Sequence, residues 1–208
     1  LGRVVRAGAV VRVRGNVQRY NNQLQLVIRG AEPLAGAVDE SLFVRAAAAD
    51  PELLWARLEA LVGEIGDPHL KQLLFRLLAD PDIGPRLKLA PAARGMHHAY
   101  RSGLLEHTLS LASSGRALAG HYRLSEDLVV AGAILHDLGK IWELEAGATI
   151  DYTDDGRLLG HLTLGVLRVE RALGELPEFP AETRRHLLHI LLSHHGASVV
   201  TSHRISAS

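Results

Sequence analysis

The hydrophobic pattern changes its period near residue 50, and this change limits what the chain can fold into more than any other feature. Between residues 9 and 30 apolar and polar side chains alternate, which is typical of strands with one buried face. From Asp50 onward apolar residues recur every three or four positions, and the Asp-Pro pairs at Asp50 and Asp67 are typical helix starts. The sequence therefore predicts a mainly α protein, a helical bundle preceded by a β segment.

The same patterns predict where the individual elements lie. Residues 9–30 are expected to form a hairpin, with Tyr20, Asn21 and Asn22 supplying the turn. Two helices are expected after Asp50 and Asp67. Four more are expected at about residues 103–120, 125–140, 158–173 and 180–195. The segment at 145–159 forms either a loop or a small hairpin.

Composition narrows the classes of protein to which the chain can belong. At 208 residues with 47% hydrophobic content, it suits one domain of ordinary size with a smaller appendage. Lysine plus arginine and aspartate plus glutamate both number 23, so any binding of phosphate must be local. No apolar run reaches the roughly 18 residues of a membrane span, and arginines interrupt any signal-peptide core near the N-terminus. We therefore expect a soluble, cytoplasmic protein with no membrane partner.

The chain has 12 histidines and no cysteine, so any metal ligands must be nitrogen or oxygen atoms. His107, His136, His194 and His195 lie beside apolar residues of expected helices or one turn from them. A single core histidine bonded to a backbone carbonyl is the commoner arrangement. Several buried together with Asp137 are costly unless a cation holds them. Imidazole and carboxylate donors suit Mn, Fe, Co, Ni or Zn, whereas Mg prefers carboxylates.

His136 and Asp137 are neighbours, which restricts where a shared ion can lie. On a helix, successive side chains project about 100° apart. Both can therefore reach one ion only if it lies at the seam between helices.

Four motifs, LLEH, ILHDLGK, GH and LSHHG, occur in this order and resemble the HD superfamily of metal-dependent phosphohydrolases. A narrower resemblance is to the YhaM type of 3′-to-5′ exoribonuclease. It is carried by APAARGMHHAYRSGLLEHTLSLA, AGAILHDLGKIWEL, TDDGRLLGHLTLGV and LLHILLSHHG. In that family an OB-fold domain precedes the HD domain, and the alternating N-terminal segment looks like its closing strands. The resemblance extends up to Gly196.

The resemblance implies a metal centre. Its ligands would be His107, His136, Asp137, His161, His194 and His195. One or two divalent ions are expected, with Asp137 as the bridge if there are two. Mn or Co is favoured, and Mg, Fe, Ni or Zn are the alternatives.

In such a centre the ions generate hydroxide at neutral pH for in-line attack on phosphorus. Asp137 and Lys140 are the expected catalytic residues, because Lys140 can add positive charge where the transition state is negative. Alternatively, Lys140 is a solvated lysine that interacts with the dipole at a helix end.

Two further groups of residues are expected to contact substrate. Substrate phosphates or a base would meet His97, His98, Tyr100, Arg101 and Arg157, although polar loops before helices often gather such residues. On the N-terminal strands, nucleic acid would meet Arg12, Arg14 and Tyr20, although exposed strands also carry arginine for solubility.

The predicted organisation has three parts. Residues 1–36 form a partial OB-fold segment, residues 37–92 a helical linker region, and residues 93–208 a C-terminally incomplete HD domain. The segment offers fewer strands than a five-stranded OB barrel needs, so its grip on nucleic acid is expected to be weakened or lost. No acidic residue follows Glu182, so the family's final Asp ligand has no counterpart. Reduced metal affinity and slow or absent catalysis are therefore expected.

Three functions follow from these observations. The first is 3′-to-5′ hydrolysis of single-stranded RNA, or of DNA, to nucleoside monophosphates. The second is hydrolysis of a small nucleotide or cyclic dinucleotide by the same metal chemistry. The third is a catalytically impaired remnant that binds or assembles through exposed strand edges. A homo-oligomer is compatible with each.

Overall fold

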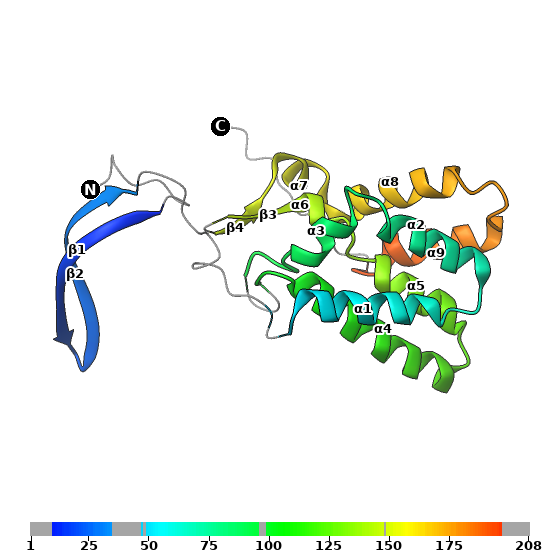
Figure 1. The fold of residues 1–208 in the computed structure, drawn as a ribbon, viewed down its shortest axis with the longest axis horizontal. Coiled ribbons are helices and arrows are strands. Elements are labelled where there is room, and N and C mark those ends of the chain that lie inside the picture. Colours follow the sequence, from blue (N-terminus) through cyan, green and yellow to red (C-terminus); the bar gives the residue numbers. More distant parts are fainter. Residues whose placement is uncertain (1–9, 35–46, 48, 96–98, 148, 197–208) are drawn as a thin grey trace. The chain divides into compact units, whose positions relative to one another are not determined.

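The computed structural model describes residues 10–34, 47, 49–95, 99–147 and 149–196. The chain divides into two compact units: residues 1–44 with 147–149, and residues 45–146 with 150–208. The first unit contains a β-hairpin, and the second contains the helices (Figure 1). The prediction of a mainly α fold with N-terminal β structure is confirmed.

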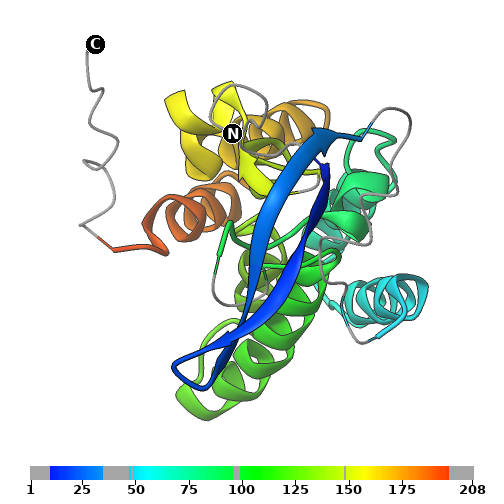
Figure 2. The same cartoon turned by 90° about the vertical axis from the view of Figure 1, so that its left-hand side faces the viewer.

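The hairpin pairs β1 (Val11–Tyr20) with β2 (Gln23–Pro33) in antiparallel register. Its turn is formed by Asn21 and Asn22, whose φ angles of 46° and 63° lie in the left-handed region. Asparagine tolerates that region better than most residues, so the turn residues suit the backbone. Figure 2 shows the ribbon's strong twist, which two-stranded sheets commonly have.

The register places most polar and most apolar side chains on opposite faces of the hairpin, with exceptions such as Arg19 opposite Leu24. Val17 lies opposite Leu26 on one face, and Arg12 lies opposite Glu32 on the other. Val17 is 68% exposed and Leu26 is 48% exposed. The alternation predicted from the sequence is therefore present, with both faces accessible.

The helical unit contains long helices, short helices and one small hairpin (Figure 1). Its elements are α1 (Pro51–Gly63), α2 (Pro68–Leu78), α3 (Gly84–Leu89), α4 (Gly103–Tyr122), α5 (Glu126–Leu135), α6 (Lys140–Glu143), β3 (Leu144–Ala146), β4 (Ile150–Tyr152), α7 (Asp154–Leu158), α8 (Gly160–Gly174) and α9 (Ala181–Ser193). Among the described residues, no helix combines the length and apolar character that a membrane crossing needs.

Two aspartates start α1 and α2 as the sequence predicts. Asp50 Oδ1 accepts a hydrogen bond from the backbone nitrogen of Glu52, at 2.9 Å. Asp67 Oδ1 accepts from His69 N and Leu70 N, at 2.9 and 3.0 Å. Such caps satisfy backbone donors that lack a partner within the helix and stabilise it by about 1 kcal/mol each.

A continuous hydrophobic core joins the helices. Leu58 of α1, Leu73 of α2, Leu104 of α4 and Leu187 of α9 are fully buried. α5 packs against α4 and α9, while α8 packs against α6 and α9. α1 and α3 also pack against α4. The domain boundaries predicted at residues 36 and 92 stay a prediction.

One predicted helix is interrupted, and this is a correction. The sequence predicted a helix at about residues 125–140, but α5 ends at Leu135 and α6 begins at Lys140, with a turn between them. At Gly139 this turn packs closely against α8, because a Cβ on it would lie 1.9 Å from the backbone oxygen of His161. The turn therefore lets the α5–α6 junction approach the start of α8.

The segment after α6 forms a small hairpin, which was one of the two predicted alternatives. β3 and β4 pair antiparallel, and Thr153 caps α7 by accepting a hydrogen bond from Gly156 N at 2.9 Å. The next helix begins at Gly160, two residues later than predicted.

Candidate metal centre

His107 and His136 meet where α4 passes the C-terminal end of α5. Their Nε2 atoms lie 3.3 Å apart. His136 Nδ1 lies 2.8 Å from Ala133 O, and because a carbonyl only accepts, Nδ1 carries the proton. The lone pair of His136 Nε2 is therefore directed toward His107 and is available to a cation.

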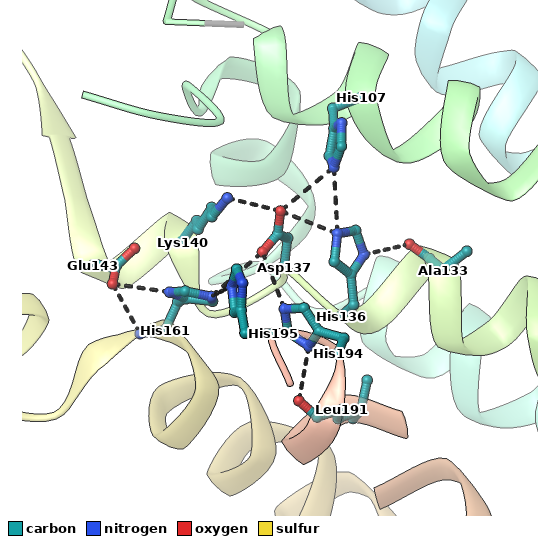
Figure 3. Close-up of polar contacts among 10 residues, drawn as sticks. All are labelled: His107, Ala133, His136, Asp137, Lys140, Glu143, His161, Leu191, His194 and His195. Atoms are coloured by element: carbon teal, nitrogen blue, oxygen red, sulfur yellow. Dashed lines mark hydrogen bonds and ion pairs between the residues drawn. The ribbon is translucent and has the colours of Figure 1, made fainter. Parts of the chain in front are cut away.

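Asp137 lies at the centre of the site, in the turn after α5 (Figure 3). It is 3% exposed. Its Oδ2 atom lies 3.1 Å from His136 Nε2 and 3.6 Å from His107 Nε2. Its Oδ1 atom lies 3.5 Å from His161 Nε2 and 3.7 Å from His194 Nε2. Each carboxylate oxygen thus faces a different pair of imidazoles.

The second set of imidazoles comes from the start of α8 and the end of α9. His161 Nε2 lies 2.9 Å from His195 Nε2. His194 Nδ1 lies 2.9 Å from Leu191 O, so its Nε2 atom also carries the lone pair. Figure 3 shows these rings turned toward Asp137.

The ligand atoms form two groups that share Asp137. One group is His107, His136 and Asp137, and the other is Asp137, His161, His194 and His195. Within each group the candidate atoms lie within 4.8 Å of one another. All six predicted ligands are therefore brought together.

The donor atoms fit a divalent cation. Asp137 Oδ1 and His194 Nε2 are buried and have no hydrogen-bond partner among the described residues. Two ligands at right angles on a cation, with metal–nitrogen distances near 2.1 Å, lie about 3 Å apart. The His107–His136 and His161–His195 nitrogen pairs match this spacing. Unpaired buried acceptors are costly, and a cation satisfies both.

The surroundings keep Asp137 ionised. Burial acts to raise its pKa, but the nearby rings of His136 and His194 and the charge of Lys140 outweigh burial, so the pKa lies below its ordinary value. Burial, aided by the charges of His194 and His161, lowers the pKa of His195. The lowered pKa of Asp137 favours its carboxylate form and the lowered pKa of His195 favours its neutral form, and these are the forms that bind metal.

Lys140 contacts the same carboxylate. Its Nζ atom lies 2.8 Å from Asp137 Oδ2, and its side chain is 17% exposed. It is the first residue of α6, a helix of a single turn. Its charge is therefore directed at Asp137, and its catalytic role stays a prediction.

Glu143 is a site residue that the sequence reasoning missed. It is 7% exposed, and its Oε1 atom accepts from both Nδ1 and the backbone nitrogen of His161, each at 3.0 Å. Burial acts to raise the pKa of Glu143, but the bonds from His161 outweigh this and the pKa is lowered. The available signal was a carboxylate between Ile141 and Leu144, two residues typical of a core.

An open cavity of about 520 Å³ borders the centre. Both ligand groups contribute to its wall through His107, Asp137 and His194. Apolar side chains, including Val129 and Ile190, also line it. A small molecule can therefore reach the ligand cluster from solvent.

The predicted substrate contacts are only partly described. His97 and His98 lie outside the described residues. The hydroxyl of Tyr100 donates a hydrogen bond to Glu106. Burial, together with this bond and the charge of Glu106, raises the pKa of Tyr100 to about 12. Arg101 is half-buried, just before α4.

Arg157 lies in α7, beside the small hairpin. Its Nη2 atom lies 3.2 Å from Asp151 Oδ1, which Arg94 also approaches at 3.5 Å. Two arginines thus share one carboxylate, and the cluster keeps a net positive charge.

The predicted nucleic-acid contacts lie on one face of β1. Arg12, Arg14 and Tyr20 are an even number of residues apart, so their side chains share the polar face of the hairpin. Both arginines lie near Glu32, at 3.8 and 3.5 Å, and remain mostly exposed. These loose ion pairs leave the arginines accessible to phosphate.

Comparison with known proteins agrees with the geometry of the site. The HD domain family model matches residues 104–205, a range that contains all six ligands. The chain is an HD-domain protein.

Curated relatives match almost the whole chain. The 3′-5′ exoribonuclease YhaM of Shouchella clausii (strain KSM-K16) is 36% identical over 190 residues, covering 90% of this chain and 59% of the relative. The protein of that name from Bacillus velezensis (strain FZB42) is 33% identical over 91% of this chain and 60% of the relative. That from Bacillus subtilis (strain 168) is 32% identical over 90% and 60%.

The chain therefore spans about three fifths of the length of these relatives. It is homologous to them across both the hairpin and the helical unit. No solved structure is significantly similar to it.

Proposed function

We propose that this protein is a metal-dependent phosphodiesterase that degrades single-stranded RNA from the 3′ end and releases nucleoside monophosphates. Single-stranded DNA is included as a second polymer substrate. One observation carries the proposal: the buried carboxylate of Asp137 is shared by two groups of metal-ligand atoms. The relatives named 3′-5′ exoribonuclease support the choice of substrate.

The proposed cofactor is one or two divalent cations. His107, His136 and Asp137 would hold one ion, and Asp137 with His161, His194 and His195 would hold the other. Nitrogen-rich sites without thiolate favour Mn or Co over Mg, and Fe, Ni and Zn share the donor preference.

The chemistry follows from charge. Divalent cations bound here lower the pKa of water and neutralise charge on phosphate oxygens. Asp137 keeps its two oxygens aimed at the two ligand groups. Lys140 holds Asp137 Oδ2 at 2.8 Å and adds positive charge beside the position of the substrate phosphate.

The proposed substrate contacts are those expected from the sequence. We assign His97, His98, Tyr100, Arg101 and Arg157 to contacts with substrate phosphates or the terminal base. Aromatic side chains and arginine suit single strands, because they stack on any base. Arg12, Arg14 and Tyr20 on the hairpin add contacts to the single strand.

The test is digestion of 5′-end-labelled single-stranded RNA in the presence of Mn²⁺. The wild-type protein should shorten the RNA from the unlabelled end, and Asp137→Ala should abolish shortening. Asp155→Ala is the matched control, because Asp155 is exposed on α7 and lies outside both ligand groups. Equal cleavage by wild type and Asp137→Ala would assign the activity to other residues.

The same preparation separates the rival functions. Cleavage of a cyclic dinucleotide without cleavage of RNA would favour a small-nucleotide hydrolase. RNA binding without cleavage of either substrate would favour an impaired remnant. Two bound ions with full nuclease activity would overturn the expectation of impairment.

A further inference from the structure

His161 differs from His136 and His194 in how its ring is held. The other two rings donate from Nδ1 to a carbonyl three residues earlier, Ala133 O and Leu191 O. His161 is the second residue of α8, so no carbonyl of its own helix lies one turn earlier. Its Nδ1 atom therefore needs an acceptor from another element.

Glu143, the last residue of α6, supplies that acceptor (Figure 3). Its Oε1 atom accepts from Nδ1 and from the backbone nitrogen of His161, both at 3.0 Å. One oxygen thus holds the ring and the main chain of the same residue, which fixes the ring's rotation. Because a carboxylate accepts, Nδ1 carries the proton and Nε2 presents its lone pair to Asp137 and His195.

The backbone bond has a second effect. Leu159, which precedes α8, makes no side-chain cap. Glu143 satisfies one of the free backbone donors at the start of this helix and places negative charge at its N-terminus. The position of α8 and the position of the His161 ring are thus tied to the same carboxylate.

The segment after α6 holds Glu143 in turn. Its backbone oxygen accepts from Thr153 N at 3.0 Å, while Thr153 Oγ1 donates to Trp142 O at 2.6 Å. A Cβ on Gly156 would lie 2.2 Å from Glu143 O, so only glycine allows this approach. The small hairpin and α7 therefore form a clamp on the main chain of Glu143.

We propose that Glu143 is a positioning residue that fixes the tautomer and orientation of His161 for the second metal group. Outer partners of this kind orient histidine ligands, and their loss typically lowers metal affinity about 10- to 100-fold. The inference rests on the proposed metal centre, but the state of the His161 ring can be measured without metal.

Three variants test it: Glu143→Ala, Glu143→Gln and Glu145→Ala. Glu145 is two residues along on β3 and exposed, so it is the matched control. In metal-free protein, long-range ¹H–¹⁵N spectra should show His161 protonated at Nδ1 in the wild type, in Glu145→Ala and in Glu143→Gln, whose amide oxygen still accepts. In Glu143→Ala the ring should populate both tautomers.

Mn²⁺ titration by calorimetry provides the second measurement. Glu143→Ala should bind one ion as the wild type does and the other about 10- to 100-fold more weakly, with Glu143→Gln in between.

A wild-type tautomer in Glu143→Ala, or unchanged Mn²⁺ affinity in folded Glu143→Ala, overturns the proposal. If Glu143→Ala does not fold, Glu143→Gln decides: unchanged affinity for both ions overturns it, and selective weakening of one supports it. Wild-type protein that binds no Mn²⁺ but keeps the Nδ1 tautomer contradicts the metal centre alone.

Discussion

Asp137 is the residue on which both ligand groups depend. Its two oxygens face different pairs of imidazoles, so it couples the groups while each keeps ligands of its own. Removing a ligand that belongs to one group should therefore leave the other group able to bind.

This arrangement predicts a difference in metal stoichiometry among three variants. His107→Ala should remove one Mn²⁺ and leave the ion held by Asp137, His161, His194 and His195. His195→Ala should weaken the other ion, and Asp137→Ala should lose both. Calorimetric titration and metal analysis of dialysed protein measure the numbers. Loss of both ions in His107→Ala would contradict two separable groups.

Tyr100 provides a prediction at high pH. Its pKa is raised to about 12, chiefly by burial and then by the bond to Glu106. Between pH 10 and 12 the native protein keeps a proton that the unfolded chain has released. The resulting stability is fully present below pH 10 and is lost as the pH rises toward 12.

The free energy of unfolding should therefore fall more steeply between pH 10 and 12 in the wild type than in Tyr100→Phe. Denaturant titrations across that range measure it, and the ultraviolet titration of Tyr100→Phe should lack the step near pH 12. Tyr122→Phe, which removes a tyrosine that is 65% exposed, is the control. Equal slopes for the wild type and Tyr100→Phe would contradict the raised pKa.

Sequence patterns predict residues whose chemistry is unusual for their position, and they miss residues that depend on tertiary contacts. The six ligands stand out because imidazoles and an aspartate interrupt apolar helical stretches. Glu143 lies three residues after Lys140 and can equally be a solvated partner of that lysine. Only the approach of α8 shows that its partner is His161.

Helix starts were predictable at the level of elements because their signals are local. Asp50 and Asp67 cap the helices that follow them. The end of α5 was not predictable from the sequence, because it depends on contacts with α8. Gly139 is compatible with a helix interior in sequence, and its close approach to His161 O arises only in the folded bundle.

Gly139→Ala should therefore be strongly destabilising. Its Cβ would lie 1.9 Å from His161 O and 2.7 Å from Gly165 N, which are backbone atoms that cannot rotate away. Overpacking costs about 1–3 kcal/mol, and we expect about 3 kcal/mol because the main chain must move. Urea unfolding monitored by circular dichroism gives the value, and weakened Mn²⁺ binding should accompany it.

Gly63→Ala is the matched control. A Cβ there meets nothing within 4 Å, and Gly63 ends α1. Its effect should lie within about 1 kcal/mol and favour folding, because alanine restricts the unfolded chain. A Gly139→Ala variant as stable as Gly63→Ala would mean that α6 does not approach α8 as closely as described.

At the scale of the whole molecule, the two units carry different parts of the proposed activity. All six proposed ligands and Lys140 belong to the helical unit, whereas the exposed arginines of β1 belong to the hairpin unit. Chemistry on a small phosphodiester should therefore depend only on the helical unit. Affinity for a polymer should depend on both.

The double variant Arg12→Ala/Arg14→Ala separates these contributions. Each arginine that neutralises a phosphate of a single strand contributes about −0.7 to the slope of log affinity against log salt concentration. The variant should therefore bind single-stranded RNA with a slope less negative by about 1.4, and more weakly at low salt. Hydrolysis of bis(p-nitrophenyl) phosphate with Mn²⁺ should be unchanged, because that substrate is too small to reach beyond the metal centre.

The control is Arg57→Ala, which removes an exposed arginine of α1 and should change neither the salt slope nor the rate on the small ester. An unchanged salt slope in the double variant would exclude the hairpin arginines from RNA binding, whereas equal losses on RNA and the small ester would place their effect on the helical unit.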